Sequence, residues 1–267
     1  MRRTTGQAVT ADGTTIGYEA TGDGPVLLLV HGAAADRRQW GRVVPLLARS
    51  FTVVAMDRRG RGLSGPLRPD HSLEVEYDDI VAVTRSLQGP VHLLGHSSGA
   101  RFALHAAPRV PALGGLALYE PPAPETFADG VPERLAALEA AGDREGILRS
   151  FLLDVAGNDV EDFSFVRGRP IWPLMVDNAL TLPAELRAVR HYRFDPAAVA
   201  HLAAPTLCLV GELSGPELRQ VAAELVAALP DARTVVLAGQ GHGAMFSAPQ
   251  LLASEVERFL LAGGARS

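Results

Sequence analysis

Residues 91–99 read Val91-His92-Leu93-Leu94-Gly95-His96-Ser97-Ser98-Gly99 and contain the pattern that decides the fold. Val91–Leu94 is a short apolar run typical of a strand buried on both faces, and a helical pattern begins at Ser98. A serine hydroxyl is a weak nucleophile, so it must be exposed at a sharp turn where a base can reach it. Glycines on either side relieve crowding in such a turn. The strand, turn and helix around Ser97 therefore predict a nucleophilic serine.

Further apolar runs alternate with helical stretches on both sides of this segment. The expected strands are Val26–Val30, Phe51–Met56, Val91–Leu94, Leu113–Tyr119, Thr206–Val210 and Thr234–Leu237. The expected helices are Asp36–Ala48, Leu73–Leu87, Ser98–Ala107, Pro216–Leu229 and Pro249–Leu261. Alternation of this kind predicts an α/β fold with a parallel sheet and helices on both of its faces.

Two parts of the chain depart from the alternation. Ala8–Thr10 and Thr14–Ala20 flank the turn dipeptide Asp12-Gly13, which predicts an antiparallel pair at one edge of the sheet. From Pro121 to about Ala200 the strand pattern disappears, and helical pieces such as Pro132–Ala141 and Glu145–Val155 take its place. We therefore expect a mostly parallel, eight-stranded core formed by residues 1–120 and 201–267, with residues 121–200 inserted as a helical cap.

Two loops that follow strands carry further candidate residues. His31-Gly32-Ala33 follows Val26–Val30, and the backbone N–H groups of Ala33 and Ser98 are candidates to bind a developing oxyanion. Alternatively, Gly32 only permits the strand to turn into a loop. His242 lies in the glycine-rich loop Gly239–Gly243 after the last expected strand, from which an imidazole could reach Ser97 as its base.

The chain resembles the α/β-hydrolase superfamily over nearly its full length. The resemblance is carried by His31-Gly32, Gly95–Gly99, Gly241-His242 and Asp57-Arg58-Arg59-Gly60-Arg61-Gly62-Leu63-Ser64. The last segment is similar to the DxRGxGxS loop after the family's fourth strand, where it is mainly structural, so we expect Asp57 to be a structural anchor. The resemblance implies a nucleophile, an acid and a histidine in that order along the chain.

One position departs from the family pattern. Most relatives place the catalytic acid after the penultimate strand, but there this chain reads Gly211-Glu212-Leu213-Ser214, with serine where aspartate is expected. A neutral serine cannot stabilise the imidazolium that forms on the base. Glu120, at the end of Leu113–Tyr119, is the preferred replacement, as in superfamily members that place the acid after this strand. It could instead be an acidic residue that opens the cap, and Glu212 and Glu217 are weaker candidates.

Composition limits the partners and the chemistry. The formal charge is −5 and no basic cluster is present, which argues against nucleic acid or a membrane surface as a partner. The chain has no lysine, which excludes Schiff-base catalysis, and the single Cys208 lies in an apolar run and is read as a buried hydrophobe. We expect a cytoplasmic monomer or homodimer that binds a small-molecule substrate.

The resemblance implies hydrolysis of an ester, thioester or lactone through an acyl-serine intermediate, with no metal and no organic cofactor. Carbon–carbon bond hydrolases, lyases and perhydrolases of the same fold use the same serine and histidine, and some relatives only bind a small molecule, so these alternatives stay open. The substrate is expected to be apolar. Residues considered for its pocket are His31, Gly32, Trp40, Phe127 and Trp172, each of which could equally be packing.

Overall fold

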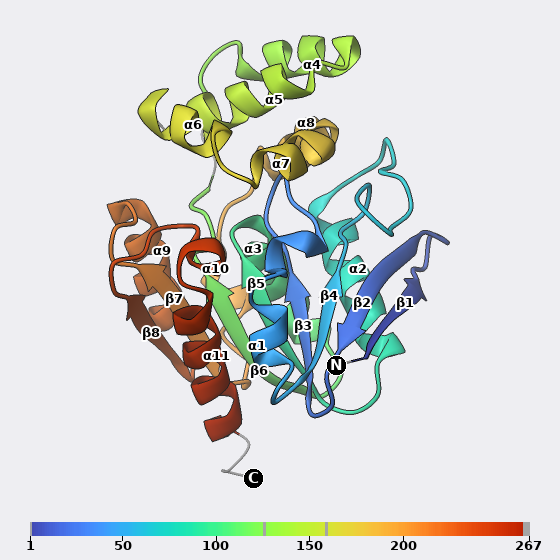
Figure 1. Cartoon of the computed structure of the whole chain (residues 1–267), viewed down its shortest axis with the longest axis vertical. Coiled ribbons are helices and arrows are strands. Elements are labelled where there is room, and N and C mark those ends of the chain that lie inside the picture. The colour runs from blue at the N-terminus through green and yellow to red at the C-terminus, as the bar shows by residue number, and fades with distance from the viewer. Residues whose placement is uncertain (1, 125–126, 158–159, 264–267) are drawn as a thin grey trace.

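The computed structural model describes residues 2–124, 127–157 and 160–263. Within these ranges the strands form one eight-stranded sheet in the order β1-β2-β4-β3-β5-β6-β7-β8 (Figure 1). Strands β1 and β2 are an antiparallel hairpin, β2 pairs antiparallel with β4, and every pairing from β4 to β8 is parallel. The predicted mostly parallel α/β sheet is therefore confirmed. The strands are β1 (Arg3–Val9), β2 (Thr15–Thr21), β3 (Val26–Val30), β4 (Thr52–Met56), β5 (Val91–His96), β6 (Leu113–Tyr119), β7 (Thr206–Gly211) and β8 (Ala232–Leu237).

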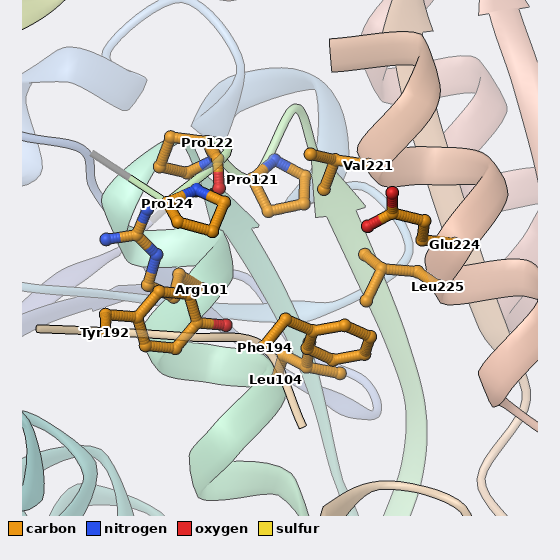
Figure 2. Close-up of a pocket in the computed structure, with 10 residues that line it drawn as sticks. All are labelled: Arg101, Leu104, Pro121, Pro122, Pro124, Tyr192, Phe194, Val221, Glu224 and Leu225. Atoms are coloured by element: carbon orange, nitrogen blue, oxygen red, sulfur yellow. Dashed lines mark hydrogen bonds between the residues drawn. The ribbon is translucent and has the colours of Figure 1, made fainter. Parts of the chain in front are cut away.

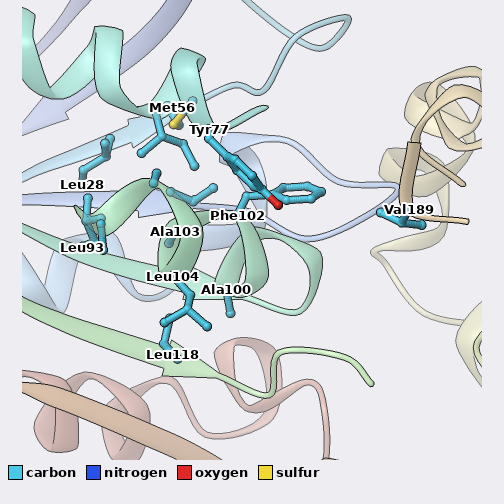
Figure 3. Packing of buried hydrophobic residues seen from close by; sticks show 14 of the residues in the cluster. Leu28, Met56, Tyr77, Leu93, Ala100, Phe102, Ala103, Leu104, Leu118 and Val189 are labelled. Atoms are coloured by element: carbon cyan, nitrogen blue, oxygen red, sulfur yellow. The ribbon is translucent and has the colours of Figure 1, made fainter. Parts of the chain in front are cut away.

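Helices cover both faces of this sheet, as predicted. Alternate residues of a strand point to opposite faces, so Leu28, Leu93 and Leu118 pack with Tyr77 and Phe102 on one side (Figure 3). Their neighbours Leu27, Leu29, Leu94 and Ala117 belong to the second apolar cluster, on the other face. The helices flanking the sheet are α1 (Val44–Leu47), α2 (Leu73–Ser86), α3 (Ser98–Ala106), α9 (Pro216–Ala228), α10 (Ala244–Ser247) and α11 (Pro249–Gly263).

The prediction of one continuous helix over Asp36–Ala48 is wrong. The structure has a short 3₁₀-helix, η1 (Arg37–Trp40), followed by the single turn α1. Gly41 lies between the two, and Pro45 has no N–H to donate to the carbonyl of residue 41, so one continuous helix cannot form. Helices α2, α3, α9 and α11 begin and end within two residues of the predicted bounds, and the short helix α10 was not predicted.

Between β6 and β7 the structure has only helices and loops among its described residues. They are α4 (Val131–Ala141), α5 (Arg144–Ser150), the π-helical turn η3 (Phe151–Val155), α6 (Val160–Arg167), α7 (Trp172–Asn178), η4 (Ala179–Thr181), α8 (Leu182–Val189) and η5 (Pro196–Ala198), and a further 3₁₀ turn, η2 (Ala107–Arg109), follows α3. Figure 1 shows α4–α8 gathered at one end of the molecule, with α7 and α8 nearest the sheet. We call the segment 121–200 the cap; its division from the core stays a prediction.

The described helices were also considered as membrane spans. None of them combines the length and the apolar character needed to cross a bilayer.

Candidate active site

Ser97 occupies the turn between β5 and α3. Its φ of 53° and ψ of −126° lie in a region that side-chain-bearing residues rarely adopt, which marks a strained turn. A methyl group added at Gly95 would stand 2.5 Å from Ala100 Cα, and one at Gly99 would stand 2.3 Å from the carbonyl oxygen of His31. The two glycines of the sequence motif are therefore required by close backbone packing, and they bring the start of α3 onto the β3 loop.

The loop after β3 lies directly against Ser97. A methyl group added at Gly32 would stand 3.2 Å from Ser97 Cβ, so the Gly32–Ala33 peptide is adjacent to the serine side chain. Ala34, the next residue but one, has a φ of 49° and is also left-handed. Ser98 is the first residue of α3, and an amide at that position has no acceptor within its own helix. The two amides predicted to bind an oxyanion thus flank the serine.

Glu120 and His242 meet at the same end of the sheet. The Nδ1 of His242 lies 2.6 Å from Oε2 of Glu120, and the other carboxylate oxygen accepts a hydrogen bond from Gly211 N–H at 2.6 Å. The Glu120 side chain is fully buried, whereas 48% of the His242 side chain is exposed. Glu120 itself has a φ of 48°, so its backbone is left-handed like that of Ser97.

The environment of Glu120 favours its ionised form. Burial raises the pKa of this carboxyl, but the hydrogen bond with His242 and the charge of that imidazole more than compensate, so the net pKa is lowered. The Ser214 hydroxyl and Gly211 N–H act in the same direction. Ser214 Oγ is buried and close to the carboxylate, although it does not complete a hydrogen bond of normal geometry. The residue in the family's usual acid position thus lies beside the carboxylate that contacts the histidine.

The other carboxylates considered from the sequence have different partners. Glu212 accepts a hydrogen bond from Gly239 N–H at 2.7 Å, and Glu217 lies in the first turn of α9. Asp57 is buried and accepts hydrogen bonds from the backbone N–H of Arg37 at 2.8 Å and of Leu63 at 2.7 Å. Of these four acids, Glu120 is the one placed against His242.

Two residues that the sequence did not single out hold the His242 loop. The Nε2–H of His96 donates to the carbonyl oxygen of His242 at 3.0 Å, and the two imidazole centroids are 4.4 Å apart. Burial and the neighbouring His242 charge keep the pKa of His96 well below its usual value, so this ring is neutral. The Tyr119 hydroxyl donates to Gly241 O and accepts from Ala244 N–H, on either side of His242.

The position of these two residues explains how the site is assembled. His96 precedes the serine and Tyr119 precedes the glutamate, so the same two strands that present Ser97 and Glu120 also anchor the histidine loop. The only sequence signal for either was its adjacency to a candidate residue at a strand end.

The residues considered for a substrate pocket are mostly engaged in packing. Trp40 is fully buried and contacts the edge of His96, and His31 donates from Nδ1 to Gly32 O at 2.9 Å. Trp172 is nearly buried and lies edge-on to Phe163, with centroids 5.7 Å apart. Phe127 lines a small hollow between α4 and α8. Of the set, Gly32 is the residue that the structure places beside Ser97.

A separate pocket lies next to the segment that follows the C-terminal end of β6 (Figure 2). It is lined by side chains of α3 and α9, including the charged Arg101 and Glu224, by Tyr192 and Phe194, and by prolines of the segment Pro121–Pro124. Its lining includes neither Ser97 nor His242. Among the described residues, no group of three or more His, Cys, Asp or Glu side chains is arranged to hold a metal ion.

Comparison with known proteins identifies the family. A family model described as the alpha/beta hydrolase family matches residues 27–255, so the chain belongs to this family. A solved structure of an alpha/beta hydrolase from Sphaerobacter thermophilus superposes with a TM-score of 0.86 at 33% identity, covering 95% of this chain and 99% of that one. The chain is accordingly a hydrolase of the α/β-hydrolase superfamily.

Three curated relatives have named activities. The pimeloyl-[acyl-carrier protein] methyl ester esterase of Stenotrophomonas maltophilia is 30% identical over 260 residues, which cover 91% of this chain and 96% of that enzyme. The 2-(acetamidomethylene)succinate hydrolase of Mesorhizobium japonicum is 27% identical over 255 residues, which cover 92% of this chain and 91% of that enzyme. The N-formylmaleamate deformylase of Pseudomonas putida is 33% identical over 182 residues, 67% of this chain, and the chain spans 61% of that enzyme's length.

Proposed function

We propose that this protein hydrolyses carboxylic ester bonds of small apolar substrates through an acyl-serine intermediate. Ser97 is the nucleophile, His242 its general base and Glu120 the acid that orients and stabilises the imidazole. The observation that carries the proposal is the 2.6 Å contact between Glu120 and His242. The His242 ring also lies against His96, the residue before the serine in the strained strand-to-helix turn.

The proposed reaction has two halves. The Nε2 of His242 takes the proton from Ser97 Oγ as that oxygen bonds to the carbonyl carbon, and Glu120 stabilises the resulting imidazolium through Nδ1–H. The ester C–O bond then breaks, and the imidazolium gives its proton to the leaving alcohol. In the second half His242 takes a proton from water as the water oxygen bonds to the acyl carbon. The bond between that carbon and Ser97 Oγ then breaks, the imidazolium returns its proton to Oγ, and the carboxylic acid is released. The N–H groups of Ala33 and Ser98 stabilise the negative oxygen in both halves.

The relatives support this chemistry and suggest one further candidate. The name of the S. maltophilia relative denotes a methyl ester as substrate. The names of the M. japonicum and P. putida relatives denote an acetamido and an N-formyl group, both of which are amides. Cleavage of a small N-acyl compound is therefore the second candidate function, and the proposed serine, histidine and oxyanion donors would serve it equally well.

Activity on matched chromogenic substrates tests both candidates. The wild-type enzyme should hydrolyse p-nitrophenyl acetate and butyrate with saturation kinetics, and Ser97→Ala should reduce kcat by about 10⁴ or more. p-Nitroacetanilide has the same acyl group on an amide nitrogen, so a kcat/KM above that for the acetate ester would favour the amide candidate. Wild-type turnover no faster than that of Ser97→Ala on every substrate would contradict the proposal and favour a protein that only binds its ligand.

A further inference from the structure

A cluster of charged side chains is buried beneath the cap, next to the serine turn. Arg58 and Arg61, from the loop after β4, both contact Glu185 of α8, with nitrogen–oxygen distances of 3.0 and 2.6 Å. Arg58 also pairs with Glu76 of α2 at 2.6 Å, and His71 lies 3.2 Å from the same carboxylate. Each of these side chains is at most 5% exposed. The site as proposed above gives this cluster no role.

One nitrogen of Arg58 reaches both halves of the candidate oxyanion hole. Its Nη1 donates to the carbonyl oxygen of Gly32 at 3.3 Å and to Oγ of Ser98 at 3.2 Å. The Gly32 carbonyl and the Ala33 N–H belong to one planar trans peptide and point in opposite directions. Fixing the direction of that oxygen therefore fixes the direction of the Ala33 N–H.

The same carbonyl is held a second time through His31. The backbone N–H of Arg58 donates to His31 Nε2 at 3.0 Å, which leaves the proton on Nδ1 for donation to Gly32 O at 2.9 Å. Burial and the charges of Arg58 and Arg61 lower the pKa of His31 to about 3, so the ring keeps this neutral form. Arg58 thus orients the Gly32–Ala33 peptide with its side chain and, through His31, with its backbone.

The rest of the guanidinium is anchored in three directions. Its Nε donates to Glu76 at 2.9 Å, its Nη2 contacts both Glu76 and Glu185, and its planar face lies 4.5 Å from the centroid of Phe102 in α3. A bidentate, stacked guanidinium has little freedom to move, and a lysine ammonium could not reproduce this set of contacts. Because Glu185 belongs to the cap, the cap contributes directly to the position of Arg58.

We propose that Arg58 is a positioning residue that aligns the Ala33 and Ser98 amides as an oxyanion hole, and that Glu185 links this alignment to the docked cap. The proposal rests on the function proposed above. Donation to the Gly32 carbonyl also polarises the shared peptide and strengthens the Ala33 N–H as a donor. The two guanidinium charges of Arg58 and Arg61 are balanced by the carboxylates of Glu76 and Glu185, so the effect of Arg58 on the oxyanion is one of geometry rather than of bare charge.

The neighbouring Arg59 offers a matched control. It belongs to the same loop and is equally buried, but it binds Asp79 at 2.6 Å and Asp12 at 2.7 Å, away from the Gly32–Ala33 peptide. Arg58→Lys and Arg59→Lys therefore make the same substitution in the same loop and each disturb a buried ion pair. A purely structural role for Arg58 predicts similar behaviour of the two variants.

The experiment measures kcat, KM and inhibition by an aryl trifluoromethyl ketone, which forms a tetrahedral oxyanion adduct with a serine. Arg58→Lys should lower kcat about 10- to 100-fold, somewhat less than the loss of a whole oxyanion donor, with KM changed less than threefold. Its affinity for the trifluoromethyl ketone should fall in parallel. Arg59→Lys should keep kcat and inhibitor affinity within threefold of wild type, whatever its melting temperature.

The outcomes separate this inference from the proposed function. Equal kcat values and equal inhibitor affinities for the two lysine variants, in an active wild-type background, would overturn the role of Arg58 alone. An inactive wild-type enzyme would instead contradict the proposed function. If Arg58→Lys does not fold, Glu185→Gln decides: a fivefold or larger loss of kcat and inhibitor affinity at unchanged KM supports the coupling, and wild-type values overturn it.

Discussion

Replacing Glu120 by glutamine tests the assignment of the relocated acid with little change in shape. In the structure one carboxylate oxygen accepts from Gly211 N–H and the other faces Nδ1 of His242, both at 2.6 Å. In the variant the amide oxygen must keep accepting the hydrogen bond from Gly211 N–H, because the flipped amide would place its NH₂ group against that N–H donor. The amide nitrogen then faces Nδ1 of His242 and forces it to accept a hydrogen bond.

This reversal has a calculable consequence. An imidazole that accepts at Nδ1 carries its proton on Nε2, where it cannot take the proton of Ser97, and an amide does not stabilise an imidazolium. Neutralising the acid of a serine–histidine–acid triad lowers kcat by a factor of about 10³ to 10⁴. Since each factor of ten is about 1.4 kcal/mol, the expected rise in the activation barrier is about 4 to 5.5 kcal/mol.

The assay is steady-state hydrolysis of p-nitrophenyl acetate, with thermal unfolding measured alongside. Glu212→Gln is the matched control, because Glu212 follows the penultimate strand but binds Gly239 N–H rather than the histidine. The control should keep kcat within about twofold of wild type, because no group that acts on Ser97 is altered. A folded Glu120→Gln enzyme with kcat within tenfold of wild type would refute the role of Glu120.

Three further changes probe the surroundings of the site. In the Glu120→Gln background, the added change Ser214→Asp should raise kcat at least tenfold, because position 214 lies beside the side chain of residue 120, which contacts His242; no recovery would contradict that geometry. Tyr119→Phe removes two hydrogen bonds to the His242 loop and should lower kcat about 3- to 10-fold, because the loop keeps its hydrogen bond from His96; an unchanged kcat would argue against a role of the hydroxyl in holding the loop. Burial and a neighbouring arginine lower the pKa of His105 to about 4, so the unfolded chain takes up this proton first and stability falls as the pH drops from about 6.5 to 4. His105→Gln should flatten that fall in melting temperature, and an identical pH profile would contradict it.

The sequence predicted the sheet well because parallel strands buried on both faces need continuous apolar runs. The bounds of β3 and β6 agree with the predicted runs to the residue, and the Asp12-Gly13 turn placed the edge hairpin correctly. The helix over Asp36–Ala48 was predicted wrongly because the prediction gave the spacing of apolar residues more weight than Gly41 and Pro45, which interrupt a helix. Local backbone chemistry decided that segment.

Sequence reasoning also pointed to Glu120, because an acid at the end of a strand next to the serine strand has few other places to project. The structure places Glu120 against His242, and its role as the catalytic acid stays a proposal. Sequence reasoning could not find Arg58, His96 or Tyr119, since their roles depend on contacts between segments far apart in the chain. The buried pairing of Arg58 with Glu185 joins residues 127 positions apart; Arg58 lies in the Asp57–Ser64 segment, but no local pattern indicates Glu185 as its partner. The roles of these residues can be recognised only in the folded structure, where the loops lie side by side.

The most direct test of the account is to trap the acyl-enzyme and locate it. Brief incubation with p-nitrophenyl acetate at acidic pH, followed by quenching and peptide mass spectrometry, should show one acetyl group on the peptide that contains Ser97. His242→Gln should form the same adduct at least a thousandfold more slowly, consistent with loss of the base. Acetylation at another residue, or equal rates in the two proteins, would contradict the pairing of Ser97 with His242.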